Sequence, residues 1–146
     1  MTSLSQFNIR ITALANRFDE NRIKTVKKVA LAVDQAVVLA TPVDTGRARA
    51  NWLVNVGAER TTAIEPYAEG TGGSTGAVNA QAAIDQAKAA VATYAGHYGE
   101  AIYMTNNLPY IEALNEGHSA QAPAGYIETA VTAAVRALIN NQLLPP

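Results

Sequence analysis

The glycine-rich segment 70–76, GTGGSTG, is the stretch of this sequence whose composition could bind a phosphate group. A dinucleotide-binding fingerprint needs a third glycine where Thr75 stands, and an ATP-type phosphate loop needs a lysine where Ala77 stands. The glycine lets the backbone approach a phosphate closely, and the lysine supplies positive charge. Thr75 and Ala77 can do neither. We therefore expect residues 68–79 to form a flexible glycine-rich surface loop.

The two histidines are the side chains that could act as a general base or as a metal ligand. His118 follows Glu116 by two residues, but a catalytic pair needs a third group that orients the base. His97 has no carboxylate at ligand spacing, the chain has no cysteine, and no serine occupies a G-x-S-x-G turn. We therefore predict no catalytic, cofactor or metal site. A small hydrolase or nucleotide-binding enzyme that uses the glycine loop and His118 is an alternative.

The segment 41–52, TPVDTGRARANW, contains two arginines at alternate positions and the only tryptophan of the chain. A helix that reaches this segment must end at Thr41, because the residue before a proline is pushed out of the helical region. From Arg47 onward apolar residues recur at every second position, which predicts a half-buried strand. Its apolar face would comprise Ala48, Ala50, Trp52, Val54 and Val56.

Four residues are expected to build the structural corner between this helix and this strand: Pro42, Asp44, Gly46 and Trp52. Proline and glycine turn the chain, while Trp52 points with the apolar set and anchors the strand to the core. The Asp44 carboxylate is expected to accept the backbone N–H groups of Thr45 and Gly46, or to pair with Arg47.

Arg47 and Arg49 lie on the polar face of the predicted strand and have no role in folding that the sequence reveals. The planar guanidinium group favours a structured acidic partner over simple solvation. Glu112 and Glu116 are four residues apart on one face of a predicted short helix, where they could accept arginines from a neighbour. These four residues are our candidates for a contact between subunits.

Formal charge is distributed unevenly along the 146 residues, whose net charge is −1. Residues 1–60 contain nine basic and five acidic side chains, a balance of +4, so residues 61–146 carry −5. Oppositely charged halves suit head-to-tail association, which generates rings when it closes, although solvated helix faces give the same pattern. The low net charge argues against a DNA-binding module, and such a module that uses the basic half is a further alternative.

The first segment, residues 4–40, has the apolar spacing of an amphipathic helix. A second apolar stripe that begins at Ile23 is out of register with the first, which comprises Phe7, Ile11, Leu14 and Phe18. An unbroken helix over this range would extend about 55 Å, beyond the roughly 40 Å width of a compact domain of this size. The helix is therefore expected either to kink near residues 18–22 or to project towards a neighbour.

The remaining segments predict further helices and a small antiparallel sheet. Helices are expected over residues 80–94, 109–116 and 126–143, and the packed face of the first comprises Ala83, Ala87, Val91 and Tyr94. A strand is expected over residues 101–107 and, on a weaker pattern, over residues 61–67. The fold class is therefore α+β, in a single domain over residues 1–146.

The sequence contains no signal for a membrane or for secretion. No apolar run approaches the roughly 20 residues of a membrane span. The first ten residues lack the basic-then-apolar order of a secretory signal, and there is no cysteine to form disulfides. We therefore expect a reducing cytoplasm, or a particle assembled there.

Two blocks of the sequence together resemble the neck or tail-completion proteins of long-tailed bacteriophages, including minor tail proteins of lambda-like phages. The first block comprises Pro42, Val43, Asp44, Thr45, Gly46, Arg47 and Trp52. The second comprises Asn106, Tyr110, Glu112, Leu114, Glu116, Gly117, Ser119, Gln121, Pro123 and Gly125. The resemblance covers about a third of the chain and does not extend to residues 60–100.

This resemblance implies a non-enzymatic structural protein of the virion, assembled in the cytoplasm of the bacterial host. Such proteins form a ring, commonly sixfold, where the tail meets the head connector. The implied partners are further copies of the chain, expected as a hexamer, and neighbouring head-connector and tail proteins. DNA would pass through the channel without sequence-specific binding, and no membrane is involved. A tail terminator or head-closure protein, which occupies an adjacent ring, is the alternative within the same class.

Overall fold

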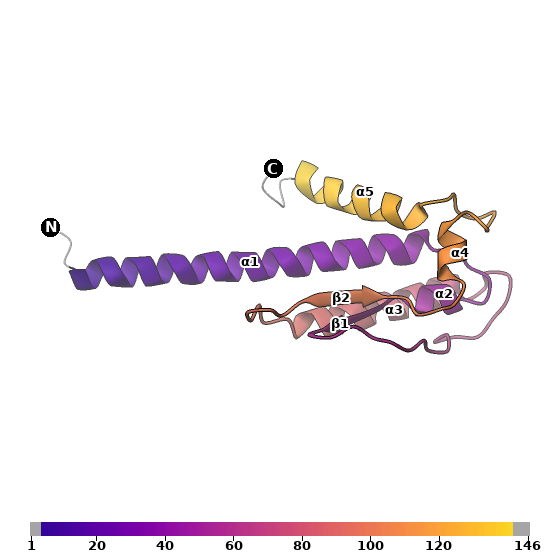
Figure 1. The fold of residues 1–146 in the computed structure, drawn as a ribbon, viewed down its shortest axis with the longest axis horizontal. Helices are drawn as coiled ribbons and strands as arrows, with labels where there is room; N and C mark the ends of the chain where they lie inside the picture. Colours follow the sequence, from indigo (N-terminus) through magenta and orange to yellow (C-terminus); the bar gives the residue numbers. More distant parts are fainter. Residues whose placement is uncertain (1–3, 142–146) are drawn as a thin grey trace.

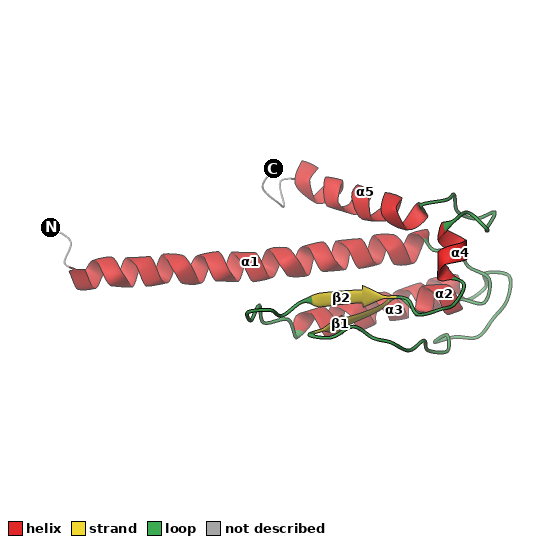
Figure 2. Ribbon diagram, in the orientation of Figure 1, coloured by secondary structure: helices red, strands yellow, loops and turns green. Residues whose placement is uncertain are grey.

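The fold, taken from a computed structural model, is described for residues 4–141, with the side chains of Gln6 and of residues 10–141. Its elements in chain order are α1 (Leu4–Ala40), α2 (Arg47–Ala50), β1 (Leu53–Val56), α3 (Gly76–Ala92), β2 (Ile102–Thr105), α4 (Ile111–Asn115) and α5 (Tyr126–Asn140). The expected α+β class, with a long N-terminal helix, a small antiparallel sheet and a C-terminal helix, is confirmed (Figure 1, Figure 2). Leu143, the expected end of the last helix, lies outside the described residues.

Helix α1 is one unbroken helix of 37 residues, so the expected alternative of a kink near residues 18–22 is wrong. Its N-terminal half extends alone past the rest of the protein (Figure 1). The side chains from Arg10 to Arg22 are all exposed, and the Arg22 guanidinium donates to the carbonyl oxygen of Gly96 at 2.9 Å, at the edge of the domain. The side chain of Phe7, the first member of the expected apolar stripe, lies outside the described residues.

The C-terminal half of α1 lies between α5 on one side and α3 with the sheet on the other (Figure 1). Val37 and Val38 of α1 are fully buried in a cluster with side chains of α3 and α5 and with Trp52. Each buried valine contributes roughly 1.5–3 kcal/mol of hydrophobic stabilisation. The residues expected to form the packed face of the second long helix are all buried, as predicted: Ala83, Ala87, Val91 and Tyr94.

In the described part of the chain, the sheet consists of β1 paired antiparallel with β2, with Leu53 opposite Thr105. Strand β2 lies within the range predicted for it, 101–107. The prediction of a strand over residues 61–67 is wrong. The backbone of this segment pairs with the side chain of Asn51 and not with another strand. Ile64 N–H donates to Asn51 Oδ1 at 2.7 Å, and Asn51 Nδ2 donates to the Ile64 carbonyl oxygen at 2.9 Å.

The strand expected from Arg47 onward is also wrong over residues 47–50, which form α2. Ala50 N–H donates to the Gly46 carbonyl oxygen at 3.1 Å, which is the i→i−4 bond of a helical turn. Alanine and arginine both favour a helix over a strand. Ala48 and Ala50 are buried whereas Arg47 and Arg49 are only half-buried, so one turn of helix here gives the same alternation as a strand.

The glycine-rich loop is shorter than the predicted 68–79, because α3 begins at Gly76. Asn79, in the first turn of α3, is fully buried. Its Oδ1 accepts the backbone N–H of Ala68 at 3.1 Å, and its Nδ2 donates to the Ala68 carbonyl oxygen at 2.9 Å. The start of the loop is therefore attached to the helix that follows it.

Asp34 is a carboxylic acid buried within the domain, on α1. It is 1% exposed, and neither of its carboxyl oxygens has a hydrogen-bond partner among the described residues. Burial raises its pKa from 3.8 to about 7, because the charged form loses its hydration. Asp34 is therefore protonated in the folded protein at pH values where it is ionised in the unfolded chain.

Replacing Asp34 with Asn is expected to remove a pH dependence of stability. Between about pH 4 and about pH 7 the folded state keeps a proton that the unfolded state has lost, so the free energy of unfolding falls as pH rises. The fall should total roughly 4 kcal/mol by about pH 8. Denaturant unfolding across this range measures the slope, with Asp85→Asn as the control at an exposed position. A D34N variant whose free energy of unfolding falls with pH as steeply as that of the natural sequence would contradict the assignment.

Candidate functional site

The corner, residues 41–46, begins after Ala40, the last residue of α1, one residue before the end that Pro42 predicts at Thr41. The Arg49 guanidinium donates from Nε to the Thr41 carbonyl oxygen at 2.9 Å and from Nη2 to that of Leu39 at 3.1 Å. These carbonyls close the last turn of α1, so Arg49 caps the negative end of the helix dipole. Trp52 is buried, and its Nε1 donates to Thr41 Oγ1 at 2.7 Å. Arg49 and Trp52 together hold the corner against the core.

Asp44 joins the corner to the glycine-rich loop. Its carboxylate accepts the backbone N–H of Gly72 at 2.8 Å, and its carbonyl oxygen accepts that of Gly73 at 2.8 Å. The hydrogen bonds expected from Thr45 and Gly46 are therefore not the ones that form. The backbone N–H groups of Ser74 and Gly76 also donate within the loop. A phosphate-binding loop would direct such groups at a ligand, whereas here they are engaged inside the chain.

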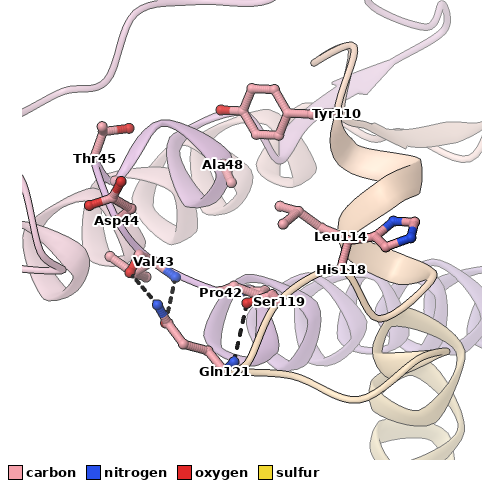
Figure 3. Close-up of a pocket in the computed structure, with 11 residues that line it drawn as sticks. Pro42, Val43, Asp44, Thr45, Ala48, Tyr110, Leu114, His118, Ser119 and Gln121 are labelled. Atoms are coloured by element: carbon pink, nitrogen blue, oxygen red, sulfur yellow. Dashed lines mark hydrogen bonds between the residues drawn. The ribbon is translucent and has the colours of Figure 1, made fainter.

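A pocket of about 340 Å³ separates the corner from the segment that contains α4 and the turn after it. Tyr110 and Leu114 point from the α4 side towards Ala48 and the corner (Figure 3). Val43 N–H donates to Gln121 Oε1 at 2.9 Å, and Gln121 Nε2 donates to the Val43 carbonyl oxygen at 2.8 Å. The Gln121 amide thus pairs with the corner backbone as a neighbouring strand would, and it fixes the two walls of the pocket together.

The hydroxyl groups of Tyr110 and Ser119 line the pocket. Partial burial raises the pKa of the Tyr110 hydroxyl, the nearby Arg47 lowers it and Glu65 raises it, with a net rise. The hydroxyl therefore remains a neutral hydrogen-bond donor. Ser119 Oγ accepts the backbone N–H of Gln121 at 3.2 Å. These groups can bind a peptide or a polar surface, but none of them is an activated nucleophile.

Two asparagines, for which the sequence predicts no contact, hold in place the wall of the pocket that contains α4. Asn106 Nδ2 donates to the Ala48 carbonyl oxygen at 3.0 Å. Asn115 Oδ1 accepts the backbone N–H of Ile127 at 3.0 Å, and the Asn115 carbonyl oxygen accepts that of Gly125 at 2.7 Å. Asparagine next to a helix end or a turn often bonds the backbone in this way, which is the signal that could have identified them.

Both candidate arginines have partners within their own chain, contrary to the expectation that they have no role in folding. Arg47 Nη2 donates to Glu65 Oε1 at 2.9 Å, with 39% of the Arg47 side chain and 77% of the Glu65 side chain exposed. Glu112 and Glu116 are exposed, on α4 and directly after it. No ion pair joins them to either arginine among the described residues. Arg47 therefore keeps an accessible charge, whereas Arg49 is used by the corner.

The histidines lie at the surface. His118 Nδ1 is 4.0 Å from Glu116 Oε2, and 69% of each side chain is exposed. His97 lies in an exposed turn after α3, where its backbone N–H donates to Glu100 Oε2 at 3.1 Å. Across residues 4–141, no group of three or more histidine, aspartate or glutamate side chains could hold a metal ion. No helix in the same range is long and apolar enough to cross a membrane.

Comparisons of this chain with protein-family models, with curated proteins and with solved structures found no match.

Replacing Gly46 with Ala is expected to destabilise the corner. Gly46 has a φ of 82°, which disfavours a side chain, and a Cβ here would overlap the amide of the buried Asn79. Gly57 has a φ of 87° but open space around it, so Gly57→Ala measures the backbone cost alone. We expect G46A to lose about 1–3 kcal/mol more than G57A in denaturant unfolding. Equal losses would show that Asn79 moves aside freely.

Proposed function

We propose that this protein is a neck or tail-completion protein of a long-tailed bacteriophage, forming a ring around the DNA channel where head and tail meet. One observation carries this proposal. The two sequence blocks that resemble such proteins are more than fifty residues apart in the chain, yet they form the facing walls of one pocket (Figure 3). The Gln121 amide and the Val43 backbone join these walls directly. The residues of the resemblance therefore lie together in the fold, which supports a shared role.

The way in which the corner uses its polar groups supports a binding role rather than a reactive one. Arg49 caps α1, Asp44 holds the glycine-rich loop and Gln121 holds Val43, so these groups fix backbone. A subunit that presents a preformed surface to its neighbours needs such rigidity, because less conformational freedom is then lost on association. Further copies of the chain and the adjoining head-connector and tail proteins are the partners of this surface.

The net charge of the chain suits a protein that lines a channel through which DNA moves without being bound. With a net charge of −1, the protein as a whole does not attract duplex DNA, and sequence-specific contacts are not part of the proposal. A tail terminator or head-closure protein would occupy an adjacent ring and have the same requirements. Electron microscopy of purified particles tests the proposal and separates these alternatives, because it locates the chain and counts the symmetry of its ring. Absence of the chain from the head–tail joint would overturn it.

Arg47→Glu is expected to leave the subunit folded and to prevent head–tail joining. Within the subunit it removes an exposed pair with Glu65, and such pairs contribute only about 0–1 kcal/mol. At the proposed contact it reverses a charge that meets acidic groups of a neighbour, for which Glu112 and Glu116 are candidates. Complementation of particle assembly and thermal unfolding of the purified subunit measure the two effects.

Arg60→Glu is the matched control for this experiment, since it makes the same change of charge at an exposed arginine away from the pocket. Normal infectious particles from R47E would remove Arg47 from the contact. Equal loss of assembly in both variants would show that the charge of the whole subunit matters rather than this residue.

A further inference from the structure

The hydrogen-bond register of the sheet decides which backbone groups of β2 face outwards. Gly57 N–H donates to the Ala101 carbonyl oxygen at 2.8 Å, so these two residues form a hydrogen-bonded pair of the antiparallel ladder. Such pairs recur at every second position, so the next residue of β2 that bonds β1 is Tyr103. Ile102 and Met104 alternate with these residues and therefore direct their backbone N–H and C=O groups to the outer edge of the sheet.

The outer edge of β1 is occupied at its middle, whereas that of β2 is open. Val54 N–H donates to Gln86 Oε1 at 3.0 Å, and the Val54 carbonyl oxygen accepts Gln86 Nε2 at 2.7 Å. A strand added beside β1 would have to break these two bonds. Within residues 4–141, no hydrogen bond joins the outward backbone groups of Ile102 or Met104 to another residue. The β2 edge can therefore accept a further strand without the loss of an existing bond.

Strand β2 has the residue types that favour pairing and lacks those that prevent it. Its sequence, IYMT at residues 102–105, contains β-branched and aromatic side chains, no charge and no proline. Proteins commonly protect an open edge with lysine, with proline or with a bulge. None of these occurs in β2, whose register with β1 is continuous. The strand is therefore suited to pair with another one.

A groove of about 500 Å³ runs beside this edge, between β2 and α1. Val26, Val29 and Val33 of α1 line one side of it (Figure 1). Ile102 and Met104 line the other side. The two residues of a cross-strand pair direct their side chains to the same face of a sheet. The residues of an added strand that bond Ile102 and Met104 would therefore place their own side chains in this groove.

The lining of the groove selects an uncharged segment. Glu100 is the charged side chain that lines it, among the residues that the structure describes. Its carboxylate already accepts three backbone N–H groups, those of residues 95–97, at 3.0, 2.6 and 3.1 Å. The remaining lining residues supply mostly aliphatic surface, which favours apolar side chains at every second position of the added strand.

The described part of this chain offers no strand for the position. Strands β1 and β2 already pair with each other, and the two form the whole sheet within residues 4–141. The β2 edge of a second copy is a poor partner, because α1 lies beside this edge in each copy. Two such edges placed together would bring both α1 helices into the same space. The segment therefore comes from a different protein.

We propose that the outer edge of β2 binds an extended segment of a different protein, whose apolar side chains at every second position fill the groove along α1. This mode of recognition is β-strand addition, in which main-chain hydrogen bonds give affinity and alternate side chains give specificity. Ile102 and Met104 supply the hydrogen bonds. The inference does not rest on the proposed function, because it follows from the backbone groups of one strand.

Amide hydrogen exchange of the full-length protein tests whether the edge is open. We expect the Ile102 and Met104 amides to exchange faster than that of Tyr103, which is bonded within the ladder. Sedimentation at the same concentration gives the mass. Slow exchange at both edge amides in a monomer would overturn the proposal, because the chain itself would then cover the edge. A dimer in which both amides are protected would overturn it as well, because a second copy would be the occupant.

A synthetic peptide of alternating valine and threonine, with a lysine at each end for solubility, is the probe for binding. Valines that bond Ile102 and Met104 direct their N–H groups to β2 and their side chains into the groove. The peptide is expected to slow exchange at both amides. No protection at a saturating concentration of the peptide would overturn the proposal.

Two methylated forms of the peptide separate strand pairing from apolar contact. N-methylation of the valines blocks the hydrogen bonds to β2 and keeps the side chains, whereas N-methylation of the threonines alters N–H groups that point away from β2. We expect the first form to bind about tenfold more weakly or worse, and the second to bind as the parent does. Equal affinities of the two forms would show that apolar contact alone binds the peptide.

Ile102→Pro tests the same contact from the side of the protein. Proline is tolerated at the first residue of a strand and on an outer edge, and here it removes one outward N–H. Ile102→Ala is the matched control, because it also loses the side chain but keeps this N–H. Circular dichroism checks that both variants are folded, and we expect I102P to bind the peptide more weakly than I102A. A folded I102P with the affinity of I102A would remove Ile102 from the contact and overturn the proposal.

Discussion

Thr41 is the residue through which the long helix is joined to the rest of the protein. Its buried hydroxyl donates to the Val37 carbonyl oxygen at 2.7 Å and accepts the Trp52 indole N–H at 2.7 Å. Its own carbonyl oxygen accepts the Arg49 guanidinium at 2.9 Å. One residue thus ends α1, orients the tryptophan of the core and positions α2. Because an unsatisfied buried polar group costs about 1–3 kcal/mol, these bonds hold the direction of the chain at the corner.

The elements of the fold were largely predictable from the sequence, because they depend on apolar spacing and on proline and glycine. The contacts of the site were not. Arg49 donates to carbonyl oxygens eight and ten residues before it in the chain. Asp44 accepts the N–H of Gly72, which lies in a loop whose position the sequence does not predict. The expectation that both arginines are free was wrong for this reason. The helical turn α2 at residues 47–50 was predicted as a strand, because over four residues both structures can bury every second side chain.

Asp34 shows that α1 is not built for stability alone. A carboxyl group that is 1% exposed and without a hydrogen-bond partner in the described residues disfavours folding when it is ionised. An apolar side chain at this position would avoid that cost. Asp34 lies in the half of α1 that packs against α3 and α5, so the cost of its ionisation falls on the packing of that half.

The continuity of α1 also fixes where the corner lies relative to the N-terminal end of the helix. The corner and its pocket lie at one end of the protein, and the N-terminal half of α1 extends at the other (Figure 1). An unbroken helix of 37 residues is about 55 Å long, so these two ends are far apart. In the proposed ring the contacts assigned to Arg47, Glu112 and Glu116 belong to the corner end, where the pocket between Val43 and Leu114 lies. A rigid helix would transmit the orientation of that end to the N-terminal half, since it bends far less readily than a loop.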